Sequence, residues 1–370
     1  MIIGIDASRA AYAQRTGTEN YSLFLIRALL DLHTEHRFRL YFNLPPQDGL
    51  FPAERAELRV MPFPRLWTHL RLSLEMARRA PHVLFVPAHV LPLLHPQRSV
   101  VTVHDLGYLY HPEAHTRWDR WYLQWSTSYN VHHARRVIAD SQATKRDLIK
   151  YCSTAPDEIH VIYPGHDRSL APVRDLSRLA AVRERYGLPS TYAIHVGTLQ
   201  PRKNLSTLLD AFATVAQKHR NLNLALVGKK GWLYEPLYAQ AQRLGLEQRV
   251  HFTGYVPRDD LPALLSAARL FLLPSLYEGF GLPVLEAMAC ELPVICSNVS
   301  SLPEVAGDAA ILVDPREPSA WAEAIERVLD DEPLRATLVD RGLCQVTRFS
   351  WERCAQQTLT VLETTTADAW

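Results

Sequence analysis

The feature that most constrains the fold is a regular alternation of short apolar runs with longer segments of helical periodicity. Residues 2–6, 83–86 and 99–104 are apolar runs of the length of strands that are buried on both faces of a sheet. Residues 18–32 repeat apolar side chains at helical spacing between the first two runs. Because alternating strands and helices form parallel sheets covered by helices, the chain is predicted to be an α/β protein.

The alternation falls into two sets, separated by a polar stretch between Pro164 and Pro172. The first set ends with the run 159–162, and the second extends from the run 192–196 to the run 310–313. A chain of 370 residues is long enough for two domains. We therefore expect two doubly wound, Rossmann-like domains facing a cleft, at residues 1–168 and 169–349, with ligands beyond the carboxyl ends of the strands.

Composition excludes several classes of protein. The net charge of +1 gives no electrostatic case for nucleic acid as the main partner. No apolar run approaches the roughly 20 residues of a membrane span, and the first residues lack the features of a signal peptide. The five cysteines include no Cys-x-x-Cys pair, so we expect neither a disulfide framework nor a zinc site, and a reducing cytoplasm as the compartment.

The segment 274–289 carries two glutamates eight residues apart, Glu278 and Glu286, directly after an apolar run. Gly279 and Gly281 make the intervening turn compliant, and Pro283 suits the first turn of a helix. We therefore expect Glu278 in a loop and Glu286 one turn into the following helix. This unit offers carboxylates for sugar hydroxyls and backbone N–H groups for an oxyanion. Spacing alone equally allows a strand–loop–helix unit with surface glutamates.

The same segment resembles the signature of retaining glycosyltransferases of the GT-B fold, in the large family four. The resemblance implies an acceptor-binding first domain, a donor-binding second domain, and a C-terminal helix at residues 350–370 that crosses back to the first. It implies that Glu278 contacts the transferred sugar and that Glu286 binds the ribose of a nucleotide. The backbone between them would hold other sugar hydroxyls, at Gly279, Phe280, Gly281 and Leu282.

A second cluster, Arg202 and Lys203, precedes a predicted helix, where cations are disfavoured unless an anion lies between them. The alternative is an exposed basic loop. The stretch resembles the diphosphate site of the family, although Thr198 stands where many members have arginine. Arg202 is expected to supply that cation, and which of Arg202 and Lys203 contacts which part of the diphosphate stays open.

Further positions follow from the same resemblance. Gly228 is expected to allow close approach of a nucleotide, and Tyr255 and Val256 fall where the family places the base. Tyr255 is alternatively an aromatic at the edge of the core. In the first half, Gly17 and Thr18 are expected to present N–H groups to the donor diphosphate, with Thr18 as a helix cap the alternative.

The run 99–104 ends in His104-Asp105. This pair matches the family position of a histidine near the sugar, so His104 is expected in the site, with Asp105 orienting its ring. The predicted catalytic group comprises Glu278, His104, Arg202 and Lys203.

Two features of the first half bear on the acceptor. Residues 64–80 predict a basic amphipathic helix, which suits either an anionic membrane or an ordinary surface position. Trp118, Trp121 and Trp125 recur at helical spacing and indicate either a buried helix face or a surface for sugar or lipid. The oligomeric state is not predicted.

The leading hypothesis is a retaining mannosyltransferase that uses GDP-mannose and a saccharide or lipid-linked acceptor in cell-surface glycan synthesis. No Asp-x-Asp occurs, so transfer without a metal or prosthetic group is expected. The alternatives are a UDP-sugar as donor, or a non-catalytic nucleotide-sugar-binding partner. A dinucleotide-dependent oxidoreductase is excluded because Asp6-Ala-Ser-Arg, not a Gly-x-Gly-x-x-Gly turn, follows the first run. We expect a cytoplasmic protein, with peripheral membrane association through residues 64–80 as a further possibility.

Overall fold

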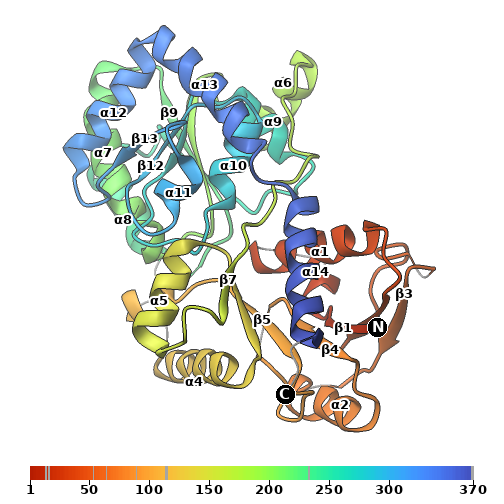
Figure 1. Cartoon of the computed structure of the whole chain (residues 1–370). Helices are drawn as coiled ribbons and strands as arrows, with labels where there is room; N and C mark the ends of the chain where they lie inside the picture. The colour runs from red at the N-terminus through yellow and green to blue at the C-terminus, as the bar shows by residue number, and fades with distance from the viewer. Residues whose placement is uncertain are drawn as a thin grey trace. The chain divides into compact units, whose positions relative to one another are not determined.

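The computed structural model describes residues 1–12, 15, 17–52, 54–63, 65–88, 90–112, 116–231 and 234–367. The chain divides into two compact units, the first made of Met1–Gly165 with Phe349–Trp370 and the second of His166–Arg348 (Figure 1). These divisions lie three residues and one residue before the positions expected from the sequence.

The first unit has a parallel sheet whose seven strands, counted over the described residues, run in the order β3-β2-β1-β4-β5-β6-β7. The strands are β1 (Ile2–Asp6), β2 (Arg37–Phe42), β3 (Ala56–Val60), β4 (Val83–Val86), β5 (Ser99–Val103), β6 (Arg136–Ala139) and β7 (Ile159–Val161). The order reverses between β1 and β4, which is the position where doubly wound sheets bind ligands.

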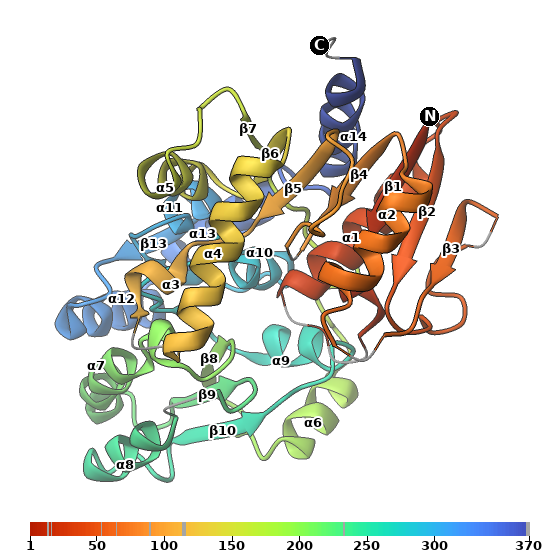
Figure 2. The same ribbon diagram turned by 90° about the horizontal axis from the view of Figure 1, so that it is seen from below.

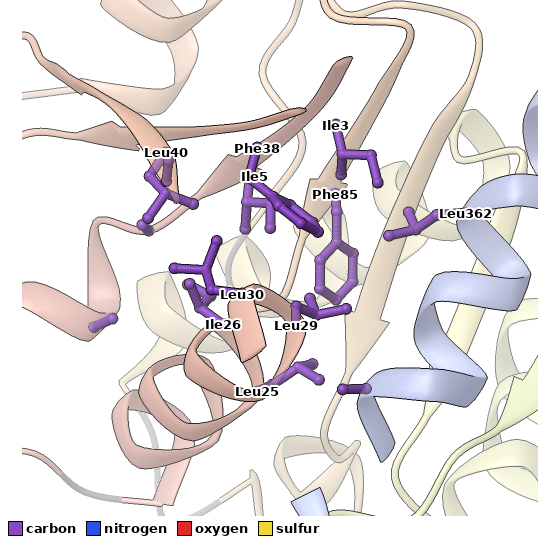
Figure 3. Packing of buried hydrophobic residues seen from close by; sticks show 14 of the residues in the cluster. Ile3, Ile5, Leu25, Ile26, Leu29, Leu30, Phe38, Leu40, Phe85 and Leu362 are labelled. Carbon is purple, nitrogen blue, oxygen red and sulfur yellow. The ribbon is translucent and has the colours of Figure 1, made fainter. Parts of the chain in front are cut away.

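Helices cover both faces of this sheet because its strands are apolar on both sides. Their bounds are η1 (Arg9–Ala11), α1 (Gly17–Asp31), η2 (Thr68–Leu72), α2 (Ser73–Arg79), α3 (Gly107–Tyr110), α4 (Arg117–His133), α5 (Gln142–Cys152) and α14 (Trp351–Ala367). On one face, side chains of α1 and α14 meet those of β1, β2 and β4, as Figure 3 shows for Leu29, Leu362 and Phe85. On the other face, α2, α4 and α5 contribute Met76, Val131 and Leu148 to a second core. The C-terminal helix therefore packs on the first unit.

The second unit repeats this architecture with a parallel sheet of six strands among its described residues, in the order β10-β9-β8-β11-β12-β13. The strands are β8 (Tyr192–Val196), β9 (Asn223–Val227), β10 (Val250–Gly254), β11 (Phe271–Leu273), β12 (Val294–Ser297) and β13 (Ala310–Val313). The helices are α6 (Leu176–Arg185), η4 (Pro201–Lys203), α7 (Leu205–Lys218), α8 (Glu235–Arg243), α9 (Leu261–Ala267), α10 (Leu282–Ala289), α11 (Leu302–Ala306), α12 (Pro318–Asp330) and α13 (Glu332–Val346). The α/β class and the two parallel sheets agree with the sequence prediction.

Two segments of the first unit differ from their sequence interpretation. The strand β3 was not anticipated, because its alternating sequence Ala-Glu-Leu-Arg-Val lies at the sheet edge and is largely solvent-facing. Trp118 and Trp121 are exposed, so the interpretation of the tryptophans of α4 as a buried helix face is wrong for these two. No helix among the described residues is both long and apolar enough to cross a membrane.

Candidate functional site

The site in the second unit is built at the carboxyl edge of its sheet. The turn η4 follows β8, and a loop of residues 274–281 connects β11 to α10. The two are joined by the Leu276 N–H, which donates to the carbonyl oxygen of Arg202 at 2.9 Å. Asn204, in the left-handed conformation with φ of 53°, donates its side-chain amide to the carbonyl oxygens of Pro274 and Pro315. These bonds fix η4 against the loop that carries Glu278.

The centre of the site is a buried carboxylate held by two cations. Lys203 Nζ lies 2.5 Å from Glu278 Oε1, and Arg202 Nη1 lies 3.0 Å from Glu278 Oε2. The hydroxyl of Ser275 donates to Glu278 Oε1 at 2.6 Å, and Arg202 also donates to the carbonyl oxygen of Tyr277. The structure thus brings together three of the four predicted catalytic residues, although Glu278 lies 75 positions after Lys203 in the sequence.

The charges of this cluster decide its protonation. Burial raises the pKa of Glu278, but the positive charges of Lys203 and Arg202 and the hydrogen bond from Ser275 outweigh it and lower the pKa to about 2. Glu278 is therefore ionised at neutral pH. The three charged groups together retain one net positive charge, which favours an anionic ligand.

Glu286 lies on α10, one turn from its start, as predicted. Arg258 bridges it to a second carboxylate: its Nη2 lies 3.1 Å from Glu286 Oε1, and its Nε lies 2.6 Å from Asp167 Oδ2. Burial raises the pKa of Asp167, but Arg258 reverses this and leaves it below its ordinary value. Sequence reasoning missed Arg258 and Asp167, because neither lies in a segment that carries a motif.

His195 of β8 was also missed. It is fully buried; its Nδ1 lies 2.9 Å from the carbonyl oxygen of Leu272, and its Nε2 has no hydrogen-bond partner. Burial and the charge of Lys203 lower its pKa to about 4. Because the Leu272 oxygen can only accept, His195 is a neutral imidazole with its proton on Nδ1. A histidine inside an apolar strand gives no sequence signal that separates it from an ordinary core residue.

Two glycines of the site are required by backbone geometry. Gly281 has φ of 107°, and a Cβ there would lie 2.7 Å from Leu302 Cδ2. Gly228 has φ of 153°, and a Cβ there would lie 1.9 Å from the carbonyl oxygen of Gly197. The close approach seen at Gly228 is to the backbone of Gly197, and its role toward a nucleotide stays a prediction.

The loop itself is anchored by Ser301, whose hydroxyl donates to the carbonyl oxygens of Glu278 and Phe280 at 2.9 and 2.8 Å. Gly279 is buried, and Leu282, the first residue of α10, is half-buried. The loop that carries Glu278 is therefore hydrogen-bonded on one side to Ser301 and on the other to Arg202 of η4.

Tyr255 is exposed, with Lys229 Nζ 5.3 Å from the centre of its ring, and Val256 beside it is buried. An exposed ring contradicts the alternative that Tyr255 belongs to the core edge. Thr198 follows β8 and is half-buried. These residues stand at strand ends, as predicted, and their roles toward a ligand remain predictions.

The remaining predicted residues belong to the first unit. Gly17 is the exposed first residue of α1, and Thr18 is the second, so Thr18 lies inside the first turn rather than at the cap. His104 follows β5, with its Nδ1 2.5 Å from Asp140 Oδ2 and its Nε2 2.9 Å from the carbonyl oxygen of Pro87. Burial lowers the pKa of His104, but the Asp140 carboxylate overcomes this and raises it.

The orientation of His104 corrects one expectation. Asp140, not Asp105, holds the ring, while the Asp105 carboxylate accepts the N–H of Gly107 at 2.8 Å. Asp140 directly follows β6, next to β5 in the sheet, so the pair arises from strand order rather than from sequence proximity. Across the described ranges, no group of three or more His, Cys, Asp or Glu side chains is arranged to hold a metal ion.

Comparison with known families gives two matches that together span both units. Residues 183–343 match the model of glycosyl transferases group 1, and residues 15–170 match that of Glycosyltransferase Family 4. The chain is 37% identical over 265 residues to the O-antigen chain mannosyltransferase B of Escherichia coli, which covers 71% of this chain and 69% of that protein.

Solved structures show the same fold over the whole chain. The sucrose-phosphate synthase of Thermosynechococcus elongatus superimposes with a TM-score of 0.78 at 23% identity and covers 100% of both chains. HepE of Anabaena, in complex with UDP and glucose, superimposes with a TM-score of 0.76 at 22% identity over 98% of this chain and 99% of that chain.

Proposed function

The chain belongs to glycosyltransferase family 4 and has the GT-B fold, and from this premise we propose that it is a mannosyltransferase that uses GDP-mannose. It acts on a nucleotide-sugar donor and a glycan acceptor. The proposed acceptor is a saccharide or lipid-linked glycan in cell-surface glycan synthesis. The observation that carries the proposal is the buried Glu278 carboxylate between Lys203 and Arg202. The relationship to an O-antigen mannosyltransferase supports mannose as the sugar.

In this proposal the second unit binds the donor. Arg202 and Lys203 face the diphosphate, and Glu278, fixed by three hydrogen bonds, receives hydroxyls of the sugar. Glu286, oriented by Arg258, binds the ribose. The other proposed donor contacts are Thr198, Tyr255, Val256, and the backbone of Gly279, Phe280, Gly281 and Leu282.

The first unit is proposed to hold the acceptor and to complete the donor site. Gly17 and Thr18 would present backbone N–H groups to the diphosphate, as the start of a helix favours anions. His104 is proposed to lie near the sugar. Since Asp140 and the Pro87 carbonyl engage both of its nitrogens, its contribution is a positive charge in a fixed position rather than proton transfer.

The chemistry proposed is transfer with retention of the anomeric configuration. The bond from the anomeric carbon to the phosphate breaks, negative charge grows on the diphosphate, and positive charge grows on the sugar ring. Cations that are already in place lower this barrier because they do not reorganise during the reaction. The acceptor hydroxyl attacks from the leaving-group face and passes its proton to a donor phosphate oxygen. Arg202 and Lys203 take the place of a metal ion.

The proposed location is the cytoplasm, with peripheral association at the inner face of the membrane, where a lipid-linked acceptor is reached. The test of the reaction uses GDP-mannose and a mannose-terminated oligosaccharide, with the new bond analysed by NMR. We expect an α-mannoside, formed equally with EDTA present. Loss of transfer in EDTA, restored by Mn²⁺, would refute the metal-free mechanism. Transfer from UDP-sugars but not from GDP-mannose would show that the donor is a UDP-sugar. No turnover with any donor would favour a non-catalytic binding partner.

A further inference from the structure

We propose that one surface of the first unit, formed by three segments, docks on an anionic lipid bilayer. The segments are residues 65–79, residues 93–94 and the first two turns of α4, and we call their combined outer face the docking surface. The inference deepens the proposed membrane association, which the sequence placed in residues 64–80 alone. Pro64 lies outside the described residues. Both α2 and α4 lie at the lower edge of this unit in Figure 1 and toward the viewer in Figure 2.

The docking surface carries several large apolar side chains that are exposed to solvent. Along the first segment, Leu70 of η2 and Leu74 of α2 are exposed four residues apart, a spacing that favours the same side of the two helices. Leu66, just before η2, is exposed as well. On α4, 79% of Trp118 and 59% of Trp121 are exposed, and the two rings meet edge to face at 6.2 Å. Exposed apolar groups of this size, gathered on one surface, indicate an interaction site.

Specific contacts make the three segments one surface. His69 of η2 lies with its Nε2 3.2 Å from the hydroxyl of Tyr122 on α4, and its ring contacts that of Trp125. The N–H of Leu94 donates to the hydroxyl of Ser73 at the start of α2, at 3.2 Å. The hydroxyl of Tyr129 on α4 donates to the carbonyl oxygen of Leu93 at 3.4 Å. The exposed Leu93 and Leu94 therefore lie beside both α2 and α4.

The charge of the docking surface selects its occupant. Five exposed arginines accompany the apolar residues: Arg65, Arg78, Arg79, Arg117 and Arg120. Of the acidic residues on the same elements, Glu75 is buried in ion pairs with Arg59 and Arg71, and Asp119 accepts a hydrogen bond from Thr116. The net charge is strongly positive. A second copy of the chain would set arginines against arginines, whereas anionic headgroups neutralise them and leave the apolar groups to enter the acyl boundary.

Co-sedimentation with lipid vesicles tests the proposal directly, because it requires neither donor nor turnover. The full chain is mixed with vesicles of phosphatidylcholine alone, or of phosphatidylcholine with phosphatidylglycerol. We expect binding to the mixed vesicles, weakened by added salt, and little binding to the neutral ones. Binding to neither vesicle, or equally to both, would overturn the proposal.

Two variants locate the contact. Leu70→Ser with Trp118→Ser and Trp121→Ser removes apolar contact, and Arg65→Ser with Arg117→Ser and Arg120→Ser removes charge. The arginine variant should lower vesicle binding by at least about tenfold, because it removes three positive charges near the anionic surface. The apolar variant should lower it by a similar factor, because it removes three side chains that enter the acyl boundary. The controls, Leu176→Ser and Arg316→Ser, change exposed residues of the second unit and should bind as the wild type does.

The outcomes separate this inference from the proposed reaction. Thermal unfolding checks that each variant folds, and transfer to a soluble oligosaccharide should be unchanged, because the docking surface holds no donor-site residue. Vesicle binding without transfer would leave the surface assignment intact and refute only the reaction. Unchanged vesicle binding in both variants, or a dimer that the same substitutions dissociate, would overturn the docking surface.

Discussion

Lys203 Nζ and Glu278 Oε1 lie 2.5 Å apart, and both side chains are almost completely buried. Neither charge is stable there without the other, because removing one partner leaves an uncompensated charge in a poorly solvated place. The pair therefore serves both the stability of the second unit and its proposed chemistry, and variants must separate the two effects.

Glu278→Gln and Lys203→Met should each lower transfer by about a hundredfold or more, since each removes a charge that faces the reacting groups. Each should also lower the free energy of unfolding, by about 3 kcal/mol, because the partner charge stays buried. Steady-state transfer and denaturant unfolding measure the two effects. The double variant Glu278→Gln with Lys203→Met should regain much of the stability and none of the activity. A double variant that transfers mannose normally would remove both residues from the site.

Arg258→Gln should raise the KM for the donor about tenfold with a smaller change in kcat, because Glu286 loses the cation that orients it. Initial-rate kinetics over a range of donor concentrations measure this. Arg185→Gln is the control, since Arg185 at the end of α6 forms an exposed ion pair with Asp260 and does not contact Glu286. Equal KM values for the two variants would contradict the role given to Glu286.

Stability should fall in acid partly because of His195. Its pKa is about 4 in the folded chain and 6.5 ordinarily, so the unfolded chain binds the proton first. The folded chain therefore keeps its full stability with respect to His195 above pH 6.5, and loses stability as the pH falls from 6.5 toward 4. His195→Asn keeps a donor for Leu272 and cannot titrate in this range. The variant should show a pH slope of unfolding free energy that is smaller by about 1 kcal/mol per pH unit between these values. If the unfolding free energies of the wild type and the variant depend equally on pH, His195 must have an ordinary pKa and be exposed to solvent.

Asp140→Asn should lower the pKa of His104, because it replaces the carboxylate that stabilises the imidazolium. NMR titration of the histidine-labelled chain, with the His104 signal assigned from His104→Gln, measures the shift. Asp105→Asn is the control and should have the smaller effect, since the Asp105 carboxylate is bonded to Gly107 instead. A larger shift in the Asp105 variant would restore the pairing expected from the sequence.

Most strands of the two sheets followed from the sequence because a buried strand needs only local information, with the edge strand β3 as the exception. Apolar runs gave β1, β4, β8 and β13 with the observed bounds, and the loop position of Glu278 followed from the glycines and Pro283 around it. The partners within the site did not follow. Asp140 meets His104 because β5 and β6 are neighbours in the sheet and their carboxyl ends lie side by side. Arg258 meets Glu286 although the strands before them, β10 and β11, are not neighbours, so only the folded structure shows this pair. His195 carries no periodic or motif signal, since its neighbours in β8 are apolar on both sides.

The claim that the second unit is a GDP-mannose site is tested most directly by the melting temperature of the full chain with a panel of nucleotide sugars. A ligand that binds the native state raises that temperature, and no acceptor is needed. We expect GDP-mannose to produce a larger rise than UDP-glucose, with the rise abolished in the Glu278→Gln and Lys203→Met double variant. A rise that is the same in the double variant, or none with any nucleotide sugar, would contradict the account.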